Sequence, residues 1–381
     1  MSTAAANPLT ATPNTVQSNP VGVTHRARND QFDLLRGLAI LLVICVHAPF
    51  NTGFQILDEA RALGRFGVQL FYFVSAMTMC YMWEARHGES RAVLKFYIRR
   101  FLRIAPLFWL AMAINLAVHG RGPDYWAPEG VTLVNIASTA LFLNGFWPDS
   151  INAVVPGGWS IAVEMSFYAL FPLLITRVKD PLTIMKLFFA ASFANLLIIR
   201  PAFLMVFKVF ASPAITPLVP EFLYLNFFNQ APIFLLGIFI YTSARAGSLG
   251  TNLRSSVVPL TLWMIVTVFW SWFAHERTPL IFAFVVLIEF AFVIAIVTRG
   301  SVSSILEAMG RRSYAIYLAH FGVLQVVAWL WVACGLKTVG VVPCILLIAI
   351  AAALCFAVGT VSEKLLEKPI HLFAKKLTSV I

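Results

Sequence analysis

Long runs of apolar residues dominate the chain and predict its secondary structure. Each run is about 17–25 residues long, which is the length that an α-helix needs to cross a bilayer. Membrane-spanning strands would alternate apolar and polar residues, and these runs do not. We therefore expect helices, which satisfy their own backbone hydrogen bonds. Eleven apolar segments can be marked, at approximately 34–50, 66–85, 101–119, 131–147, 159–176, 182–207, 227–244, 256–274, 279–298, 312–334 and 340–361.

Basic residues between these segments predict which side of the membrane each loop faces. The stretch before and into segment 101–119 is strongly basic and is expected in the cytoplasm. Its basic residues are Arg86, Arg91, Lys95, Arg99, Arg100 and Arg103. Segment 101–119 then ends on the far side of the membrane. Only one crossing, back to the cytoplasm, fits between that end and the next basic loop, around Arg177. We therefore interpret the short, polar segment 131–147 as re-entrant or interfacial, and expect ten crossings with both termini cytoplasmic.

The ends of the chain differ from its apolar middle. Residues 1–30 are rich in Ala, Thr, Asn and Pro, and predict a disordered cytoplasmic tail without the apolar core of a signal peptide. Residues 31–368 form the predicted transmembrane domain, and residues 369–381 a basic cytoplasmic C-terminal tail. The predicted fold class is therefore all-α integral membrane protein, with no soluble domain longer than a loop.

The composition is that of a membrane protein, and it argues against a nucleic-acid-binding or metal-binding protein. Hydrophobic residues make up 60% of the chain and charged residues only 12%. The net charge of +11 would favour nucleic-acid binding in a soluble protein. Here the basic residues lie in short loops, so we expect no nucleic-acid partner. The five cysteines lie in apolar stretches without metal or redox spacing, and we expect no metal.

Two polar residues in the first apolar segment are the main candidates for chemistry. Arg36 and His47 are eleven residues apart, which is within about 20° of three full helical turns, so both lie on one helix face. The rise between them is about 16 Å. They can line one groove, with Arg36 near the cytoplasmic edge holding an anion and His47 about halfway through the apolar layer as a base. The alternative is a packing histidine and a snorkelling arginine.

Six short motifs occur in an order that resembles the acyltransferase-3 family of membrane O-acyltransferases. The resemblance spans roughly residues 31 to 370. The motifs are Arg36-x10-His47, Gly64 to Ser75, Tyr97 to Pro106, Gly158 to Tyr168 with its Trp-Ser-x3-Glu element, Gly310 to His320, and Glu367-Lys-Pro369.

The resemblance implies a donor, an acceptor and a location. The donor would be cytoplasmic acetyl-CoA or another acyl-CoA, and the acceptor a carbohydrate or lipid-linked glycan of the cell envelope. The location would be the inner (plasma) membrane of a bacterium. It also implies that Arg36, His47 and the basic motif, which is the stretch Tyr97 to Pro106, are needed for activity.

The basic motif suits a donor that carries phosphates. Arg99, Arg100 and Arg103 are predicted to bind acyl-CoA, because arginine can bind phosphate with two parallel hydrogen bonds. Arg100 and Arg103 are three residues apart and share a helix face. The alternative is that the motif only sets topology and contacts anionic lipids.

Further candidates lie in the motifs near residues 160 and 320. Glu164 is predicted to orient the acceptor hydroxyl or a basic partner such as Arg36, with a structural ion pair as the alternative. Trp159 and Ser160 lie near the non-cytoplasmic end of that helix, and His320 is either a second cavity histidine or a core residue. Three tyrosines are expected to form interhelical hydrogen bonds. They are Tyr168, Tyr314 and Tyr317.

Two hypotheses of different classes follow. In the first, an acyltransferase uses His47 as the general base on a sugar hydroxyl, either directly or through an acyl-His47 intermediate. In the second, the protein is a transporter or proton-coupled permease with titratable residues along its path. Those residues would be His47, Glu164, Glu289 and His320.

Overall fold

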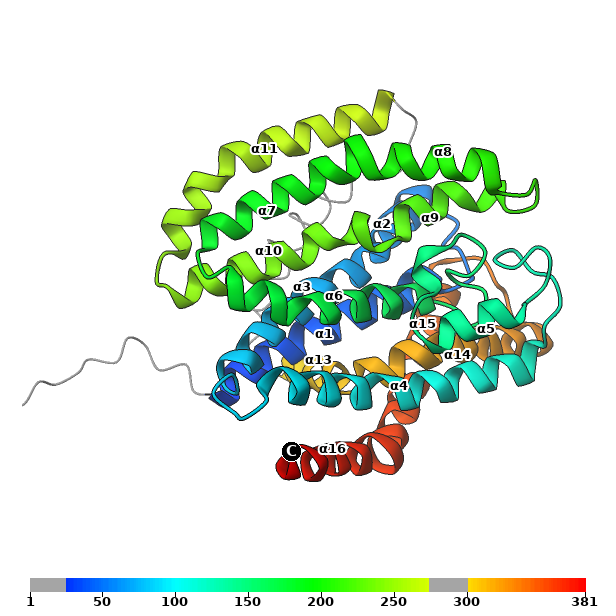
Figure 1. Ribbon diagram of the computed structural model, residues 1–381. Helices are drawn as coiled ribbons and strands as arrows, with labels where there is room; N and C mark the ends of the chain where they lie inside the picture. The colour runs from blue at the N-terminus through cyan, green and yellow to red at the C-terminus, as the bar shows by residue number, and fades with distance from the viewer. Residues whose placement is uncertain (1–24, 274–300) are drawn as a thin grey trace, which may run out of the picture.

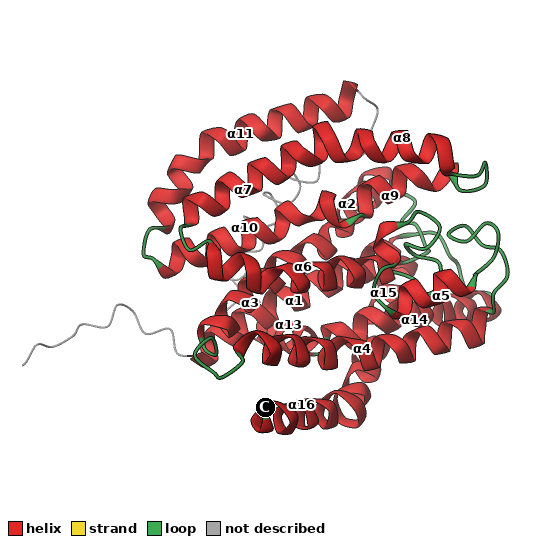
Figure 2. Ribbon diagram, in the orientation of Figure 1, coloured by secondary structure: helices red, strands yellow, loops and turns green. Residues whose placement is uncertain are grey.

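The computed structural model describes residues 25–273 and 301–381, and every regular element in these ranges is a helix (Figure 2). The first half contains α1 (His25–His47), α2 (Gln55–Ala62), η1 (Leu63–Phe66), α3 (Gly67–Glu84), α4 (Ala92–His119), α5 (Leu133–Ala140), η2 (Asn144–Phe146), α6 (Gly158–Arg177), α7 (Pro181–Ala194), η3 (Asn195–Ile199) and α8 (Arg200–Phe210). The second half contains η4 (Thr216–Leu218), α9 (Val219–Leu225), α10 (Phe227–Arg245), α11 (Leu249–Phe273), α13 (Ser301–Arg311), α14 (Ser313–Ala333), α15 (Val341–Ser362), η5 (Glu363–Glu367) and α16 (Lys368–Val380).

Seven helical stretches within the described ranges are long and apolar enough to cross a membrane. They are Gln55–Glu84, Ala92–His119, Gly158–Arg177, Pro181–Phe210, Thr216–Arg245, Ser313–Ala333 and Val341–Val380. The predicted segments 34–50 and 256–274 also form helices, α1 and α11. The predicted segment 279–298 lies outside the described residues. The chain is thus an all-helical integral membrane protein.

The helices run roughly side by side, with α1 and α3 in the middle (Figure 1). In that view α7, α8 and α11 lie on one side of this pair, and α4, α14 and α16 on the other. Fully buried apolar side chains such as Ile40, Leu70 and Phe239 fill the space between the helices. Many apolar side chains on the outside of the bundle are exposed, as the lipid-facing surface of a membrane protein requires.

Two glycines allow α13 to pack directly against α1 beside Arg36. A Cβ atom on Gly37 would lie 1.9 Å from the carbonyl oxygen of Leu306, and one on Gly310 would lie 1.7 Å from that of Asp33. Neither position has room for a side chain, so glycine is required for the two backbones to approach this closely. This contact fixes the first turns of α1, from which Arg36 projects.

Local capping explains two helix starts. The hydroxyl of Thr132 and the amide of Asn135 form a reciprocal capping box at the start of α5. Asp180 caps α7 by accepting hydrogen bonds from Thr183, and these bonds hold the pKa of Asp180 below its usual range. The eight residues of α5 span about 12 Å, which is too short to cross a bilayer and agrees with a non-spanning segment 131–147.

Three helices extend beyond the boundaries that the apolar runs predict. The predicted disordered tail 1–30 overlaps α1, which already begins at His25. The predicted segment 101–119 is the second part of α4, which begins at Ala92 and includes the basic motif in the helix. The predicted C-terminal tail 369–381 is almost entirely the helix α16, which packs against α4. Each difference has the same cause, because charged and polar helical turns do not appear in a search for apolar runs.

Candidate active site

Three neighbouring cavities contain most of the predicted site residues. We call them the inner cavity, the basic pocket and the His47 pocket. The inner cavity, about 70 Å³ in volume, lies between α1, α3, α4, α6 and α14 and is lined by Arg36, Ser75 and Glu164 among others. The basic pocket, about 680 Å³, lies between α4 and α16, and the His47 pocket, about 640 Å³, lies at the ends of α1 and α4 that carry His47 and His119. The two larger cavities have the size of ordinary ligand sites.

Shared wall residues join the three cavities in a row. Arg100 and Arg103 line both the basic pocket and the inner cavity. Val68 and Tyr317 line both the inner cavity and the His47 pocket. The inner cavity therefore lies between the other two, and a molecule that passes from one large pocket to the other must pass these side chains.

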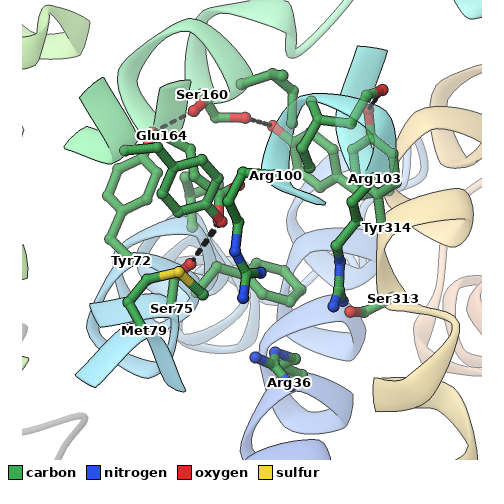
Figure 3. A pocket seen from close by; sticks show the side chains of 16 residues that line it. Arg36, Tyr72, Ser75, Met79, Arg100, Arg103, Ser160, Glu164, Ser313 and Tyr314 are labelled. Atoms are coloured by element: carbon green, nitrogen blue, oxygen red, sulfur yellow. Dashed lines mark hydrogen bonds between the residues drawn. The ribbon is translucent and has the colours of Figure 1, made fainter. Parts of the chain in front are cut away.

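Three arginines point into the inner cavity from two helices. Arg36 comes from α1, and Arg100 and Arg103 come from α4, with their guanidinium groups turned toward a common region (Figure 3). Arg36 also forms an ion pair with Asp33 at 3.1 Å and donates to the hydroxyl of Thr78 at 2.7 Å. Arg103 forms no hydrogen bond or ion pair through its side chain within the described ranges. Converging like charges repel one another, so this arrangement favours an anionic ligand.

Arg100 is held in place by unusual neighbours. Its side chain is almost fully buried, and its Nη2 lies 2.6 Å from the sulfur of Met82. The guanidinium also lies 5.8 Å from the ring centre of Phe96 and 5.7 Å from that of Tyr168. A thioether and two ring faces compensate a charge only weakly, so much of the positive charge of Arg100 is left for a ligand.

The hydrogen-bond partners of Glu164 are hydroxyl groups and not a basic side chain. Its carboxylate accepts hydrogen bonds from the hydroxyls of Ser75, at 2.5 Å, and of Tyr168. Arg36 pairs with Asp33 instead, and in the described part of the chain Glu164 forms no ion pair. The alternative of a structural ion pair is therefore not seen in the described ranges, and the prediction that Glu164 orients the acceptor hydroxyl or a basic partner stays a prediction. The carboxylate lines the inner cavity, where its charge partly balances the three arginines.

The prediction that Arg36 and His47 line one groove is also wrong. Arg36 lines the inner cavity, whereas His47 is the last residue of α1 and lines the His47 pocket. Side chains from other helices, Val68 of α3 and Tyr317 of α14, stand between the two spaces. Helical spacing correctly predicts the shared face of α1, but it does not report what neighbouring helices place between two of its residues.

The backbone of α1 fixes the orientation of the His47 ring. Its Nδ1 lies 2.9 Å from the carbonyl oxygen of Val43, and because a carbonyl only accepts, Nδ1 carries the proton. In the neutral ring this leaves Nε2 as the nitrogen with a free lone pair. The ring is exposed within its pocket and packs against Phe321, with ring centres 4.5 Å apart. A neutral, oriented imidazole is the arrangement that a general base requires.

His320 lies directly behind His47. The two ring centres are 5.2 Å apart, and His320 is fully buried. Its Nδ1 donates to the carbonyl oxygen of Tyr317, and its Nε2 has no hydrogen-bond partner among the described residues. His320 lines none of the three cavities, so it supports His47 from the core side.

The predicted interhelical role of the tyrosines is confirmed. Tyr314 donates to the carbonyl oxygen of Ile104 at 2.8 Å and joins α14 to α4. The hydroxyl of Tyr317 lies 3.0 Å from the carbonyl oxygen of Gly157 and accepts from Ser160 at 2.8 Å. Tyr168 joins α6 to α3 through Ser75, at 3.0 Å. Ser160 lines the inner cavity and Trp159 the His47 pocket, so this pair of neighbours faces both spaces.

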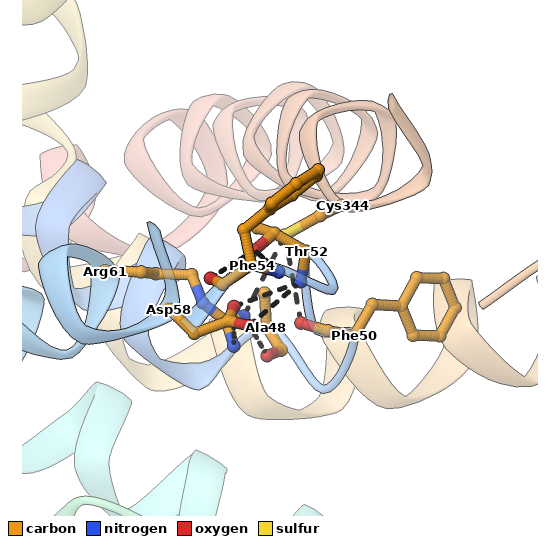
Figure 4. Close-up of polar contacts among 7 residues, drawn as sticks. All are labelled: Ala48, Phe50, Thr52, Phe54, Asp58, Arg61 and Cys344. Atoms are coloured by element: carbon orange, nitrogen blue, oxygen red, sulfur yellow. Dashed lines mark hydrogen bonds and ion pairs between the residues drawn. The ribbon is translucent and has the colours of Figure 1, made fainter. Parts of the chain in front are cut away.

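A polar cluster holds the loop that follows His47 (Figure 4). Arg61 of α2 donates to the carbonyl oxygen of Ala48 at 2.6 Å and lies 3.5 Å from the carboxylate of Asp58. Asp58 in turn accepts from the backbone N–H of Thr52 at 3.0 Å. The residue directly after His47 is thus tied to α2, which limits the movement of the imidazole.

Sequence reasoning missed residues of both large pockets. In the His47 pocket it missed the neutral amides Gln69, Asn115, Asn152 and Gln325 and the aromatic residues Trp126, Tyr224 and Phe321. In the basic pocket it missed the wall formed by α16. Polar residues near helix ends carry no distinctive spacing, but the i, i+4 pair His371 and Lys375 is a signal that could have identified the inner face of α16.

The helices and cavities define a polytopic membrane protein with one cation-rich pocket and one pocket that contains a histidine. The acyltransferase-3 family model, described as "Acyltransferase domain", matches residues 29–359. The chain therefore belongs to this family and is an O-acyltransferase.

Two curated relatives are similar to this chain. "Exopolysaccharide production protein ExoZ" of Rhizobium meliloti (strain 1021) is 29% identical over 127 residues, which cover 33% of this chain and 37% of that protein. "Acyltransferase MdmB" of Streptomyces mycarofaciens is 25% identical over 316 residues, which cover 76% of this chain and 78% of that protein. No solved structure matches the chain.

Membership of this family favours the enzyme over the permease. Of the four residues that a proton path would use, His47 and His320 lie side by side, Glu164 lines the inner cavity, and Glu289 lies outside the described residues. The same residues suit acyl transfer, and the family decides between the two hypotheses.

Proposed function

We propose that this enzyme transfers an acyl group, in the simplest case acetyl, from cytoplasmic acyl-CoA to a hydroxyl of a cell-envelope or exported sugar. The observation that carries the proposal is the row of three cavities, with cations at one end and His47 at the other. The donor binds from the basic pocket, which faces the cytoplasm. The acceptor binds in the His47 pocket, and the chain crosses the inner membrane of a bacterium ten times with both ends in the cytoplasm.

Charge supports the donor assignment. The basic pocket is lined by eight lysine and arginine residues and by only two carboxylates. Arg99 is paired with Glu89, whereas Arg100 and Arg103 have no carboxylate partner in the described ranges. Arginines without carboxylate partners suit the phosphates of coenzyme A, and Arg36 deeper in the inner cavity offsets negative charge as the thioester reacts.

Neutral polar and aromatic side chains support the acceptor assignment. The His47 pocket is lined by four side-chain amides and five aromatic residues, and its single arginine is outnumbered by two carboxylates. Such a lining suits an uncharged ligand rich in hydroxyl groups, which it can orient by hydrogen bonds while excluding water. A sugar of a lipid-linked or exported glycan has this chemistry.

In the proposed reaction His47 acts as general base. Its Nε2 accepts the proton of the acceptor hydroxyl while the hydroxyl oxygen attacks the thioester carbonyl carbon. The new C–O bond forms, the C–S bond breaks, and the proton passes from His47 to the departing thiolate of CoA. In the relay variant, Nε2 attacks the thioester carbonyl carbon, so that an N–C bond forms and the C–S bond breaks to release the CoA thiolate. The acceptor hydroxyl then attacks the same carbon, the N–C bond breaks, and the freed Nε2 takes the hydroxyl proton, which passes to the thiolate.

Mass spectrometry of envelope glycans tests this function. We expect the glycans of cells that contain the enzyme to carry one additional acyl unit compared with cells from which the gene is deleted. The mass difference names the donor group and the modified glycan names the acceptor. An identical glycan profile in the two strains, at equal membrane levels of the protein, would refute the proposal.

A further inference from the structure

The C-terminal helix α16 continues from α15 through η5 and lies beneath α4, against which it packs (Figure 1). The helix bends at the π-helical turn η5, in which Glu363 pairs with Arg312 of the α14 start at 2.8 Å and with Lys368 at 3.1 Å. Ala374 and Thr378 of α16 are buried. Both ends of the turn are therefore anchored, and α16 has a defined position on the bundle.

The two faces of α16 differ. One face lines the basic pocket with His371, Ala374, Lys375 and Thr378. The opposite face exposes Leu372, Phe373 and Val380. The helix α16 thus forms the wall of the basic pocket opposite the basic motif of α4.

Cations outnumber carboxylates in this pocket, and several of them form no ion pair with the described residues. Four of its cations form no side-chain hydrogen bond or ion pair there: Arg86, Arg103, Arg311 and Lys375. The pocket has only two carboxylates: Glu89 is paired with Arg99, and Glu367 accepts from the hydroxyl of Ser362 and attracts Arg103. Two carboxylates cannot balance its eight lysine and arginine residues. A fold that gathers unpaired cations from four segments of the chain is stabilised when a ligand with several negative charges binds between them.

We propose that α16 is a clamp for the donor, in which Lys375 and His371 bind the nucleotide phosphates of acyl-CoA. This inference rests on the proposed use of acyl-CoA. Coenzyme A carries a diphosphate and a separate ribose phosphate, which is more negative charge than Arg100 and Arg103 alone can bind. Lys375 and His371 lie one turn apart on the pocket face of α16 and provide a second set of donors on the opposite wall.

Binding of CoA to the purified full-length protein in nanodiscs of neutral lipid tests the clamp. We expect the double variant His371→Ala/Lys375→Ala to bind CoA about tenfold more weakly than the native protein, because charge-assisted hydrogen bonds are lost. Lys376→Ala is the matched control, since Lys376 lies on the same helix but does not line the pocket. Lys375→Arg keeps the charge and should retain binding, and an unchanged thermal midpoint shows that the variants fold.

Three results would overturn the inference. If the folded double variant binds CoA as tightly as the native protein, α16 has a structural role only. If it keeps CoA affinity but retains less phosphatidylglycerol than the native protein after purification from mixed lipid, the cluster binds lipid phosphates. If the native protein itself does not bind CoA, the donor assignment fails together with the clamp, which distinguishes that failure from the first two.

Discussion

The two large pockets lie at opposite ends of the same bundle and have opposite chemistry. The basic pocket has eight basic and two acidic side chains, whereas the His47 pocket has one arginine, two carboxylates and a lining of amides and aromatic rings. Both α3 and α4 contribute residues to each pocket. The difference indicates that the bundle serves two ligands of different charge, which meet across the inner cavity between them.

The largest expected effect is the loss of His47. We expect His47→Ala to reduce acyl transfer by about 10²–10⁴-fold, because the general base is removed, while CoA binding at the other end stays unchanged. Initial rates of CoA release with the purified protein measure the effect. His87→Ala is the matched control, since Nδ1 of His87 also faces a helix-end carbonyl, that of Glu84, but His87 lines none of the three cavities. Equal activity of the His47 variant would refute its role.

The next effect concerns Arg103, which lines both the basic pocket and the inner cavity. We expect Arg103→Ala to raise the KM for acyl-CoA by roughly 10–100-fold, because an uncompensated cation is removed from the phosphate site. The KM for the acceptor should not change. Lys186→Ala, an exposed cation of α7 outside the three cavities, serves as the control. A rise in the KM for the acceptor instead would contradict the assignment of the donor and the acceptor to separate pockets.

A smaller effect, on the KM for the acceptor and not on the KM for the donor, is expected for Trp126. This aromatic residue lines the His47 pocket, and its neighbour Tyr125 is exposed and does not. Trp126→Ala should raise the KM for the glycan acceptor by roughly three- to tenfold, as the loss of one aromatic contact predicts, and leave the donor KM unchanged. Tyr125→Ala should change neither value. Steady-state rates at varied acceptor concentration provide the measurement.

The smallest effect is expected for Arg61, which positions the residue after His47 without lining a cavity. Arg61→Ala should lower kcat by about two- to fivefold and leave both KM values unchanged, because one hydrogen bond that limits the loop is lost. Gln55→Ala removes an exposed contact with Glu59 on the same helix and should have no effect. Arg61→Lys, which keeps a donor, should recover part of the lost kcat, whereas a change confined to KM would contradict the positioning role.

Much of the fold was predictable from apolar runs, since α3, α6, α10, α14 and α15 lie where long uncharged stretches predict them. The contact between α1 and α13 was not, because it depends on two glycines that are distant in sequence, Gly37 and Gly310. The amphipathic α16 was missed for a different reason. Its lysines resemble a basic tail until the apolar residues between them are placed on a helix.

The candidate site was predictable where residues act within one helix. The spacing of Arg100 and Arg103 correctly placed both on one face, and both line the same two cavities. The site was not predictable where its residues come from different helices. The partners of Glu164 come partly from another helix, and the separation of Arg36 from His47 depends on Val68 and Tyr317, which no spacing within α1 can report.

Cysteine labelling from the two sides of the membrane tests most directly that the two pockets open on opposite sides and that only one binds the donor. The exposed Cys334 is first replaced by serine, and single cysteines are then introduced as Ser379→Cys in the basic pocket and Gln325→Cys in the His47 pocket. With a membrane-impermeant maleimide, we expect Gln325→Cys to react from outside intact spheroplasts, and Ser379→Cys only in inverted vesicles. CoA should protect Ser379→Cys alone. Labelling of both positions from one side, or protection of Gln325→Cys by CoA, would contradict the account.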